Sequence, residues 1–414
     1  RRGEEEKTME DSGASDHTDD ATFQFLSDKE LMDVIKAGPL YDAGIHDPIP
    51  CEEWRKYAEL HVLYNSIELL HNAEVMSNLS VHSDAIASRV YHFYLPILFR
   101  VLFLLKAHEQ KHQQRQQNGG NNNTTTTTKI PPLFIGIEAP QGLGKSTLVN
   151  VLQTLIYNSV VLSLDDLYLP RAVQQDLGQK KHQGNPLLTF RGNPGTHDLP
   201  LAKETIKKLK HINDGVGGTV ALPRYNKKAC NGRGDRIPRE DWPCVSGPTD
   251  IVFLEGWCLG FERPREFESK ILSVDARVYF APINEYLMEY ETVFNNAIDS
   301  WMIIKAGDWR WAYEWRLEQE RKSGPGGLTD AQVRDFVDRF APTYDACLQN
   351  LHDRIENKRL EDGHSALLIE VNKDRSVKME NAQIEIIGNI LGKARARQPL
   401  HNNNDNDNNG AMDA

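Results

Sequence analysis

Residues 139–147 read A-P-Q-G-L-G-K-S-T and lie between an apolar run and a helical pattern. They match the phosphate-loop pattern G-x-x-x-x-G-K-[ST] except at its first position, which is Ala139. Gly142 and Gly144 allow the backbone to turn its N–H groups toward an anion, and Lys145 adds a positive charge. Ser146 offers a hydroxyl to Mg²⁺. The pattern predicts a nucleotide site, with contacts from Ala139, Pro140, Gln141, Gly142, Leu143, Gly144, Lys145, Ser146 and Thr147.

Carboxylates follow two further apolar runs. Asp165 and Asp166 come directly after V-V-L-S-L, and Glu255 comes directly after D-I-V-F-L. In a doubly wound sheet, ligands bind at the carboxyl ends of the strands. A carboxylate there accepts a proton from an attacking hydroxyl or holds Mg²⁺, so we predict a catalytic base at Asp165 and a metal ligand at Glu255. The simpler interpretation is that these residues cap helices.

Two loop-like stretches, 189–200 and 222–236, are rich in Gly, Pro and basic residues. In an acidic chain, such a concentration of cationic side chains predicts a pocket for a small anion. Two ordinary surface loops would give the same composition. The residues expected at this pocket are Asp166, Arg191, His197, Asp198, Arg224, Tyr225, Lys227 and Arg236.

The helical stretch 309–324 carries Arg316 among Trp and Glu residues. A mobile basic lid would close over a triphosphate and exclude water, and Arg316 is the candidate for it. The alternative is a solvated helix with ion pairs at helical spacing, such as Arg316 with Glu320.

Around these residues the chain alternates buried strands and helices, which predicts an α/β fold with a doubly wound parallel sheet. Strands are expected at L-F-I-G-I-E-A, V-V-L-S-L, D-I-V-F-L-E-G, A-R-V-Y-F-A-P and A-L-L-I-E-V. We predict five segments. They are a disordered acidic tail (1–22), a helical region packed on the core (23–112), a low-complexity linker (113–129), the kinase-like core (130–391) and a disordered tail (392–414).

The 414 residues carry a net charge of −11, which argues against a broad nucleic-acid surface. Five cysteines lie far apart without C-x-x-C spacing, which is typical of a reducing compartment. The most apolar stretch, 94–105, contains Pro96 and Arg100 and is shorter than the roughly 20 residues of a membrane span. We therefore expect it to be a buried helix, with no membrane partner.

Together these motifs resemble the plant-type D-glycerate 3-kinases, which belong with the P-loop kinases similar to uridine kinase, phosphoribulokinase and pantothenate kinase. The resemblance rests on A-P-Q-G-L-G-K-S-T-L-V, S-L-D-D-L-Y-L-P, L-L-T-F-R-G-N-P-G-T-H-D-L-P-L, L-P-R-Y-N-K-K-A-C-N-G-R-G-D-R, F-L-E-G-W-C-L-G-F, Y-E-W-R-L-E-Q-E and L-T-D-A-Q-V-R-D-F-V-D-R-F-A-P-T-Y-D. It covers most of residues 130–375 and is more specific than the phosphate loop alone.

The resemblance implies ATP- and Mg²⁺-dependent phosphorylation of D-glycerate to 3-phosphoglycerate, a photorespiratory step in the chloroplast of photosynthetic cells. It implies that Asp165 is the base, with Asp166 as the alternative, that Lys145 and Arg316 stabilise the transferred phosphoryl group, and that Ser146 and Glu255 hold the metal. We expect a monomer. A fungal or cytoplasmic relative would share the core motifs.

Three alternatives remain at this stage. The chain could be another small-molecule kinase of the same fold, for a nucleoside or pantothenate. It could instead be a nucleotide-dependent switch that uses the basic loops to bind a protein. A disulfide between Cys230 and Cys244 could close the site on oxidation. Separately, residues 371–377 are expected near the nucleotide base.

Overall fold

The computed structural model describes residues 22–397 except positions 46, 71–83, 119–128, 215–217, 272, 323–327 and 358–364. The predicted N-terminal tail up to residue 21, most of the predicted linker and the end of the C-terminal tail lie outside this described part.

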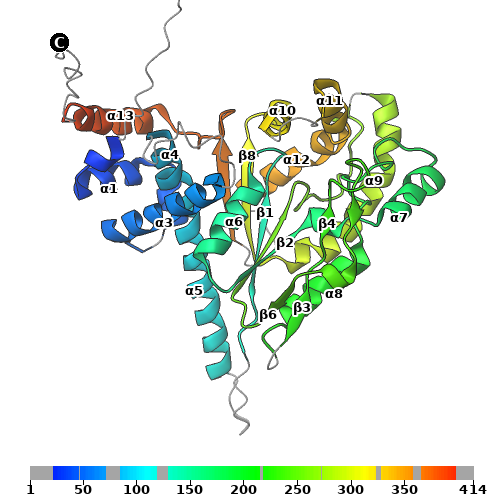
Figure 1. Cartoon of the computed structure of the whole chain (residues 1–414), viewed down its shortest axis with the longest axis horizontal. Coiled ribbons are helices and arrows are strands. Elements are labelled where there is room, and N and C mark those ends of the chain that lie inside the picture. Colours follow the sequence, from blue (N-terminus) through cyan, green and yellow to red (C-terminus); the bar gives the residue numbers. More distant parts are fainter. Residues whose placement is uncertain are drawn as a thin grey trace, which may run out of the picture.

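A five-stranded parallel sheet forms the centre of the molecule (Figure 1). Its strand order is β2-β7-β1-β8-β9, so the strand that leads into the phosphate loop is in the middle. Every neighbouring pair is parallel. The strands are β1 (Leu133–Glu138), β2 (Ser159–Ser163), β7 (Ile251–Gly256), β8 (Ser300–Ala306) and β9 (Ser365–Val371). The predicted doubly wound parallel sheet is therefore confirmed.

Two small antiparallel pairs lie outside this sheet. They are β3 (Thr219–Ala221) with β6 (Cys244–Ser246), and β4 (Tyr225–Asn226) with β5 (Asp235–Arg236). The N-terminal helices are α1 (Asp28–Ala37), α2 (Tyr41–Gly44), α3 (Cys51–Leu70), α4 (Asp84–Arg89) and α5 (Leu95–Asn118). The remaining α-helices are α6 (Lys145–Leu155), α7 (Arg171–Asp176), α8 (Leu199–Lys210), α9 (Val274–Val293), α10 (Ala312–Lys322), α11 (Asp330–Asp338), α12 (Ala341–Glu356) and α13 (Asn381–Arg395).

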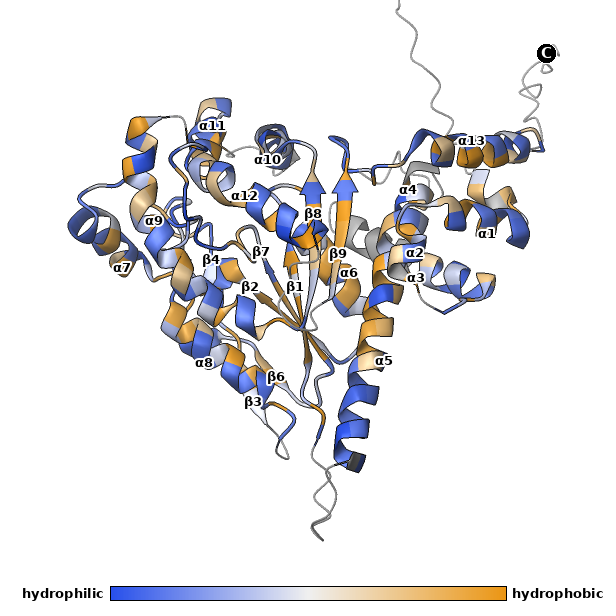
Figure 2. Ribbon diagram, turned by 180° about the vertical axis from the view of Figure 1, so that it is seen from behind, coloured by the Kyte–Doolittle hydropathy of each residue, from blue (hydrophilic) through white to orange (hydrophobic). Residues whose placement is uncertain are grey.

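Both faces of the sheet are buried, because side chains of successive strand residues enter two different cores. On β1, Phe134 belongs to the core that includes α8, α9 and α12. Leu133 and Ile135 belong to the other core, which includes α6, α13 and the N-terminal helices. Figure 2 shows apolar strands with amphipathic helices on either side. The continuous apolar runs of the sequence follow from this double burial.

The N-terminal helical region shares its core with the sheet. Trp54 of α3 and Leu95 of α5 are buried in the same cluster as Ile135. Among the described residues, Ile86–Gln117 is long and apolar enough to cross a membrane by length and composition, but 61% of its most apolar window is buried inside the molecule. This burial agrees with the expectation of a core helix.

Two predicted boundaries fall inside helices. Helix α5 continues to Asn118, beyond the predicted linker start at 113, because Gln and Arg in this stretch are good helix formers. Helix α13 likewise extends to Arg395, beyond residue 391.

The strand predicted at A-R-V-Y-F-A-P is wrong, because these residues lie in α9. The Ser273 side chain caps this helix by accepting a hydrogen bond from Ala276 N. The buried residues Phe280, Ile283 and Leu287 recur at helical spacing. The sequence analysis also missed β8, whose residues Trp301–Ile304 are buried on both faces of the sheet.

We expect that Trp54→Ala lowers the free energy of unfolding by about 3–5 kcal/mol, because Trp54 is fully buried and its ring lies 4.7 Å from that of Phe99. Urea titration followed by circular dichroism should show one transition with a lower midpoint. A variant whose N-terminal helices unfold in a separate early transition would contradict a shared core.

Candidate active site

The phosphate loop joins β1 to α6 in the conformation that its glycines require. Gly142 and Gly144 have φ angles of 79° and 102°, in the left-handed region that favours glycine. The Lys145 Nζ donates to the carbonyl oxygens of Ala139 at 2.7 Å and Pro140 at 3.3 Å, so its side chain folds back over the loop. Ser146 and Thr147 are exposed in the first turn of α6. The N-terminus of α6 and the Lys145 ammonium therefore both contribute positive charge at the phosphate loop.

Three other elements hold this loop in position. The Gln141 N–H donates to the hydroxyl of Tyr344 at 3.1 Å, and Arg375 Nε donates to the carbonyl of Gly142 at 3.1 Å. A β-carbon on Gly142 would lie 2.6 Å from the β-carbon of Trp315, so α10 packs directly against the loop. Residues 371–377 thus lie beside the phosphate loop, and their contact with the base stays a prediction.

Asp165 lies in a 3₁₀ turn (Leu164–Leu167) that directly follows β2. One carboxylate oxygen accepts a hydrogen bond from Tyr168 at 2.8 Å, and the other forms an ion pair with Lys227. Burial raises the pKa of Asp165, but Lys227 and the hydrogen bonds outweigh it and hold this pKa below its ordinary value. Asp165 is therefore ionised, and 34% of its side chain is exposed.

Asp166 has a different set of partners. Its oxygens accept from Arg224 Nη1 at 2.9 Å and from the backbone N–H of Tyr225 at 3.1 Å. Burial raises the pKa of this carboxyl, although Arg224 opposes the shift. Asp166 thus holds the start of β4 in place. Because one of its two contacts is with the backbone, we assign it a structural role.

Glu255 lies near the carboxyl end of β7 and is buried. Its Oε1 accepts a hydrogen bond from the hydroxyl of Ser163 at 2.6 Å, and Ser163 Oγ in turn accepts from the Asp165 N–H at 3.2 Å. Burial raises the pKa of Glu255, and the charge of Lys145 acts against this shift. Ser163 therefore connects the Glu255 carboxylate to the backbone of Asp165. Lys145 lies close enough to interact with Glu255.

The donor set suits Mg²⁺. Among the described residues no group of three or more His, Cys, Asp or Glu side chains could hold a metal alone. Mg²⁺ is usually bound through one or two carboxylates together with substrate phosphates and water. The hydroxyl of Ser146 and the carboxylate of Glu255 are hard oxygen ligands of this kind.

The structure brings the two basic loops together around Asp165, but most of their cations already have partners. Arg236 pairs with Asp198 at 2.9 Å and donates to the Tyr168 carbonyl at 2.7 Å. Asp198 also caps α8. Arg191 donates to backbone carbonyls of residues 227, 232 and 233, and its guanidinium lies 5.5 Å from the ring of Tyr225. These arginines therefore hold the two basic loops together, and the predicted anion pocket stays a prediction.

His197 does not add a positive charge to the basic loops. It is buried, its Nδ1 is 2.5 Å from the Tyr290 hydroxyl, and its ring stacks on Tyr168 at 4.4 Å. Burial lowers the pKa of His197 to about 4, despite the nearby charge of Asp165. The side chain of Lys227, by contrast, is 56% exposed, so it is the cation best able to change partner.

Comparison with known proteins identifies the family. The chain is 36% identical over 301 residues to the chloroplastic D-glycerate 3-kinase of Arabidopsis thaliana, covering 71% of this chain and 62% of that protein. It is 33% identical over 240 residues to an uncharacterized kinase of Schizosaccharomyces pombe, covering 54% of this chain and 84% of that kinase. A solved D-glycerate 3-kinase from Cryptococcus neoformans var. grubii matches with a TM-score of 0.57 and 30% identity, over 68% of this chain and 97% of that one. No family model matches the sequence.

The chain belongs to the D-glycerate 3-kinase family. It spans 62% of the length of its plant relative. Membership agrees with the parallel sheet and the phosphate loop, and it supports nucleotide binding and kinase chemistry. The roles of individual site residues are not tested by these similarities and stay predictions.

Arg316 is the predicted lid residue, and its partners lie on α10 and on the neighbouring helix α11. Its guanidinium is 2.5 Å from Glu320 and 3.1 Å from Gln319, and it lies 5.0 Å from the ring of Phe336. The ion pair is the one that the alternative interpretation predicted. Because Trp315 packs on the phosphate loop, Arg316 is close to the site by position, and its role as a lid residue stays a prediction.

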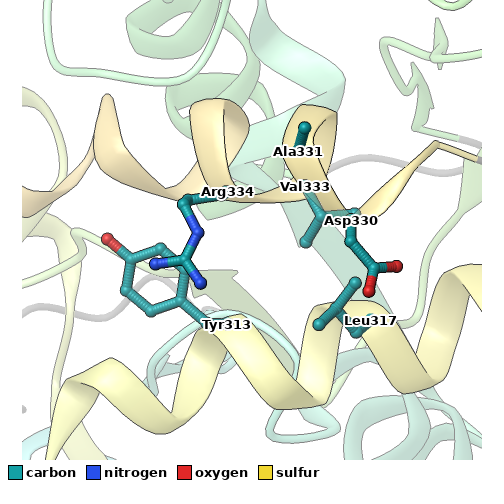
Figure 3. A pocket seen from close by; sticks show the side chains of 6 residues that line it. All are labelled: Tyr313, Leu317, Asp330, Ala331, Val333 and Arg334. Carbon is teal, nitrogen blue, oxygen red and sulfur yellow. The ribbon is translucent and has the colours of Figure 1, made fainter.

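A hollow between α10 and α11 is separate from this network (Figure 3). Its lining residues are Tyr313, Leu317, Asp330, Ala331, Val333 and Arg334. None of the predicted site residues lines it.

Cys230 and Cys244 are both exposed and unpaired, so a regulatory disulfide between them stays a prediction.

The sequence analysis missed Glu138, the last residue of β1. Its side chain is fully buried, and both carboxyl oxygens lack a hydrogen-bond partner in the described part of the chain. Burial raises the pKa of Glu138 well above its ordinary value, although the charge of Lys145 opposes this. The sequence did contain a signal for this residue. Glu138 is the one acidic residue of an otherwise apolar strand, and it lies directly before the phosphate loop.

We expect Glu138→Gln to stabilise the protein more at pH 8 than at pH 5. Burial raises the pKa of Glu138 in the folded protein, whereas the unfolded chain ionises at the ordinary pKa of about 4.5, so wild-type stability is lost as pH rises above that value. Glutamine has no such loss. Melting temperatures at both pH values measure this, with exposed Glu52→Gln as the control for losing one charge. Equal differences at both pH values would contradict a raised pKa.

Proposed function

We propose that this protein transfers the γ-phosphoryl group of ATP to D-glycerate, forming 3-phosphoglycerate and ADP. The observation that carries the proposal is the position of Asp165. Asp165 follows β2, and its backbone N–H is connected through Ser163 to Glu255. Its carboxylate is paired with the exposed cation Lys227. In this proposal Asp165 is the base, Lys227 is the cation for the substrate carboxylate, and both act beside the phosphate loop.

The phosphate loop binds the nucleotide in this proposal. The backbone N–H groups at the start of α6 and the Lys145 ammonium stabilise the negative charge that develops on the transferred phosphoryl group. Lys145 now donates to Ala139 and Pro140 carbonyls, which are weaker partners than phosphate oxygens. Ser146 and Glu255 would hold Mg²⁺, which neutralises charge on the phosphates when it is bound. Arg316 is proposed to add charge after release from Glu320.

Lys227 and Asp165 are proposed to separate when the substrate binds. The carboxylate of D-glycerate competes for the Lys227 ammonium, which leaves Asp165 without its main stabilising charge. The pKa of Asp165 then rises toward its ordinary value, which makes it a better proton acceptor. The terminal hydroxyl oxygen attacks the γ-phosphorus, the bond to the bridging oxygen of ADP breaks, and the hydroxyl proton moves to Asp165.

The proposed compartment is the chloroplast, on the name of the plant relative, with the cytoplasm as the alternative because fungal kinases are also similar. In a photosynthetic cell the reaction would salvage photorespiratory glycerate. Fractionation of cells that express the full-length protein distinguishes the two compartments.

An ATP turnover assay over D-glycerate, L-glycerate, uridine, pantothenate and buffer tests the function. We expect ADP release only with D-glycerate, and 3-phosphoglycerate as the product. Asp165→Asn should lower kcat by about 10²–10⁴-fold with ATP binding intact, because the general base is lost. Asp166→Asn is the matched control and should chiefly lower thermal stability.

Three outcomes of this assay would count against the proposal. Turnover with uridine or pantothenate would favour another small-molecule kinase. Equal hydrolysis in every well would favour a nucleotide-dependent switch. Loss of kcat in Asp166→Asn but not in Asp165→Asn would reverse the assignment of the base.

Lys227→Met should raise the KM for D-glycerate about tenfold or more and leave the KM for ATP unchanged, because a charged contact with the substrate carboxylate is lost. Steady-state kinetics with each substrate varied in turn measures the two constants. Lys228→Met, an exposed neighbour in the same loop, is the control. A changed KM for ATP with an unchanged KM for D-glycerate would refute this role.

A further inference from the structure

Arg89 lies at the end of α4, in the N-terminal helical region and far from the phosphate loop in sequence. A β-carbon placed on Gly144 would be 4.0 Å from Arg89 Nη2, and apart from the neighbouring residues of the chain no other described residue lies as close to that position. Gly144 caps the N-terminus of α6 and directly precedes Lys145. The guanidinium of Arg89 therefore reaches the rim of the phosphate loop.

Two aromatic rings hold the Arg89 side chain in place. The guanidinium carbon is 5.8 Å from the ring centroid of Phe93 and 5.5 Å from that of Tyr94. Both rings are buried in the core that the helical region shares with α6. Cation–π contacts of this kind restrict a guanidinium but do not use its N–H donors. The Nε of Arg89 is shielded from solvent and has no hydrogen-bond partner among the described residues.

A second arginine near the loop, Arg375, is used differently. It donates to the carbonyl of Gly142, pairs with Glu318 at 2.8 Å and lies 5.4 Å from the ring of Trp315. These contacts give Arg375 a structural role that positions the loop. Arg89 differs because its Nη2 approaches the loop at Gly144 and its Nε has no hydrogen-bond partner among the described residues. A guanidinium with an unused donor beside a phosphate loop points to a ligand with acceptor oxygens.

We propose that Arg89 binds a phosphate group of the nucleotide, so that the N-terminal helical region completes the nucleotide site. A guanidinium offers several donors in a plane, which suits phosphate oxygens. Arg89 adds a second positive charge to that of Lys145 at the N-terminus of α6. The proposal requires nucleotide binding only, so it can fail or succeed independently of D-glycerate as the substrate.

Calorimetric titration of the full chain with ADP, and with tripolyphosphate as a probe without a nucleoside, tests this. Arg89→Ala should raise the Kd for both ligands about tenfold or more, because a charge-assisted contact is lost. Arg89→Lys keeps the charge but not the planar donors and should give an intermediate Kd. In the kinetic assay, Arg89→Ala should raise the KM for ATP and not that for D-glycerate.

Arg55→Ala is the matched control. Arg55 belongs to the same helical region, and it bonds Asp28 and the Leu26 carbonyl there. It should lower the melting temperature without changing either Kd. An unchanged Kd in Arg89→Ala, or equal weakening in Arg55→Ala, would show a structural role only. Weaker ADP binding with unchanged tripolyphosphate binding would place Arg89 against the nucleoside and overturn the proposal. If Arg89→Ala does not fold, Arg89→Gln and Arg89→Lys allow the same comparison.

Discussion

The parallel register of β1, β7 and β2 is the constraint on which the site depends. Glu255 pairs with Ile137 on one side and with Ser163 on the other. The three strands therefore end at one edge, where the phosphate loop, Glu255 and Asp165 meet. Because successive side chains of a strand point to opposite faces, a shift of one residue in β7 would move Glu255 to the other face of the sheet. The apolar residues that bury both faces thus also determine which carboxylates face the phosphate loop.

The ion pairs at that edge of the sheet are of two kinds: some hold loops in place, and one joins residues that we propose take part in the reaction. Arg224 with Asp166 and Arg236 with Asp198 are largely shielded pairs that also bond the backbone. Burying such pairs costs desolvation energy, and breaking them leaves an unpaired charge, so they are suited to hold loops in place. The pair of Asp165 with Lys227 differs because the lysine is exposed and flexible. In a chain with a net charge of −11, the site is therefore a network of paired charges rather than an open basic surface.

The N-terminal helices are integrated with the catalytic core rather than attached to it. Their apolar side chains pack in the same cluster as those of α6 and β1, which form the two sides of the phosphate loop. Packing of this kind lets residues from before position 100 approach the loop at a fixed geometry. It also explains why the apolar first part of helix α5 is buried.

The sequence by itself determined the features that short contiguous patterns encode. The phosphate loop and four of the five central strands were predicted because glycine geometry and double burial act over a few residues. An apolar run of about seven residues fits a buried strand or a buried helix equally well, so A-R-V-Y-F-A-P was assigned wrongly and β8 was missed. Partner choice among the charged residues was decided only by the tertiary structure. Asp165 and Lys227 are 62 positions apart, and Arg89 meets Gly144 from a different region of the chain. No local pattern encodes such contacts, because they exist only after the sheet and helices have packed.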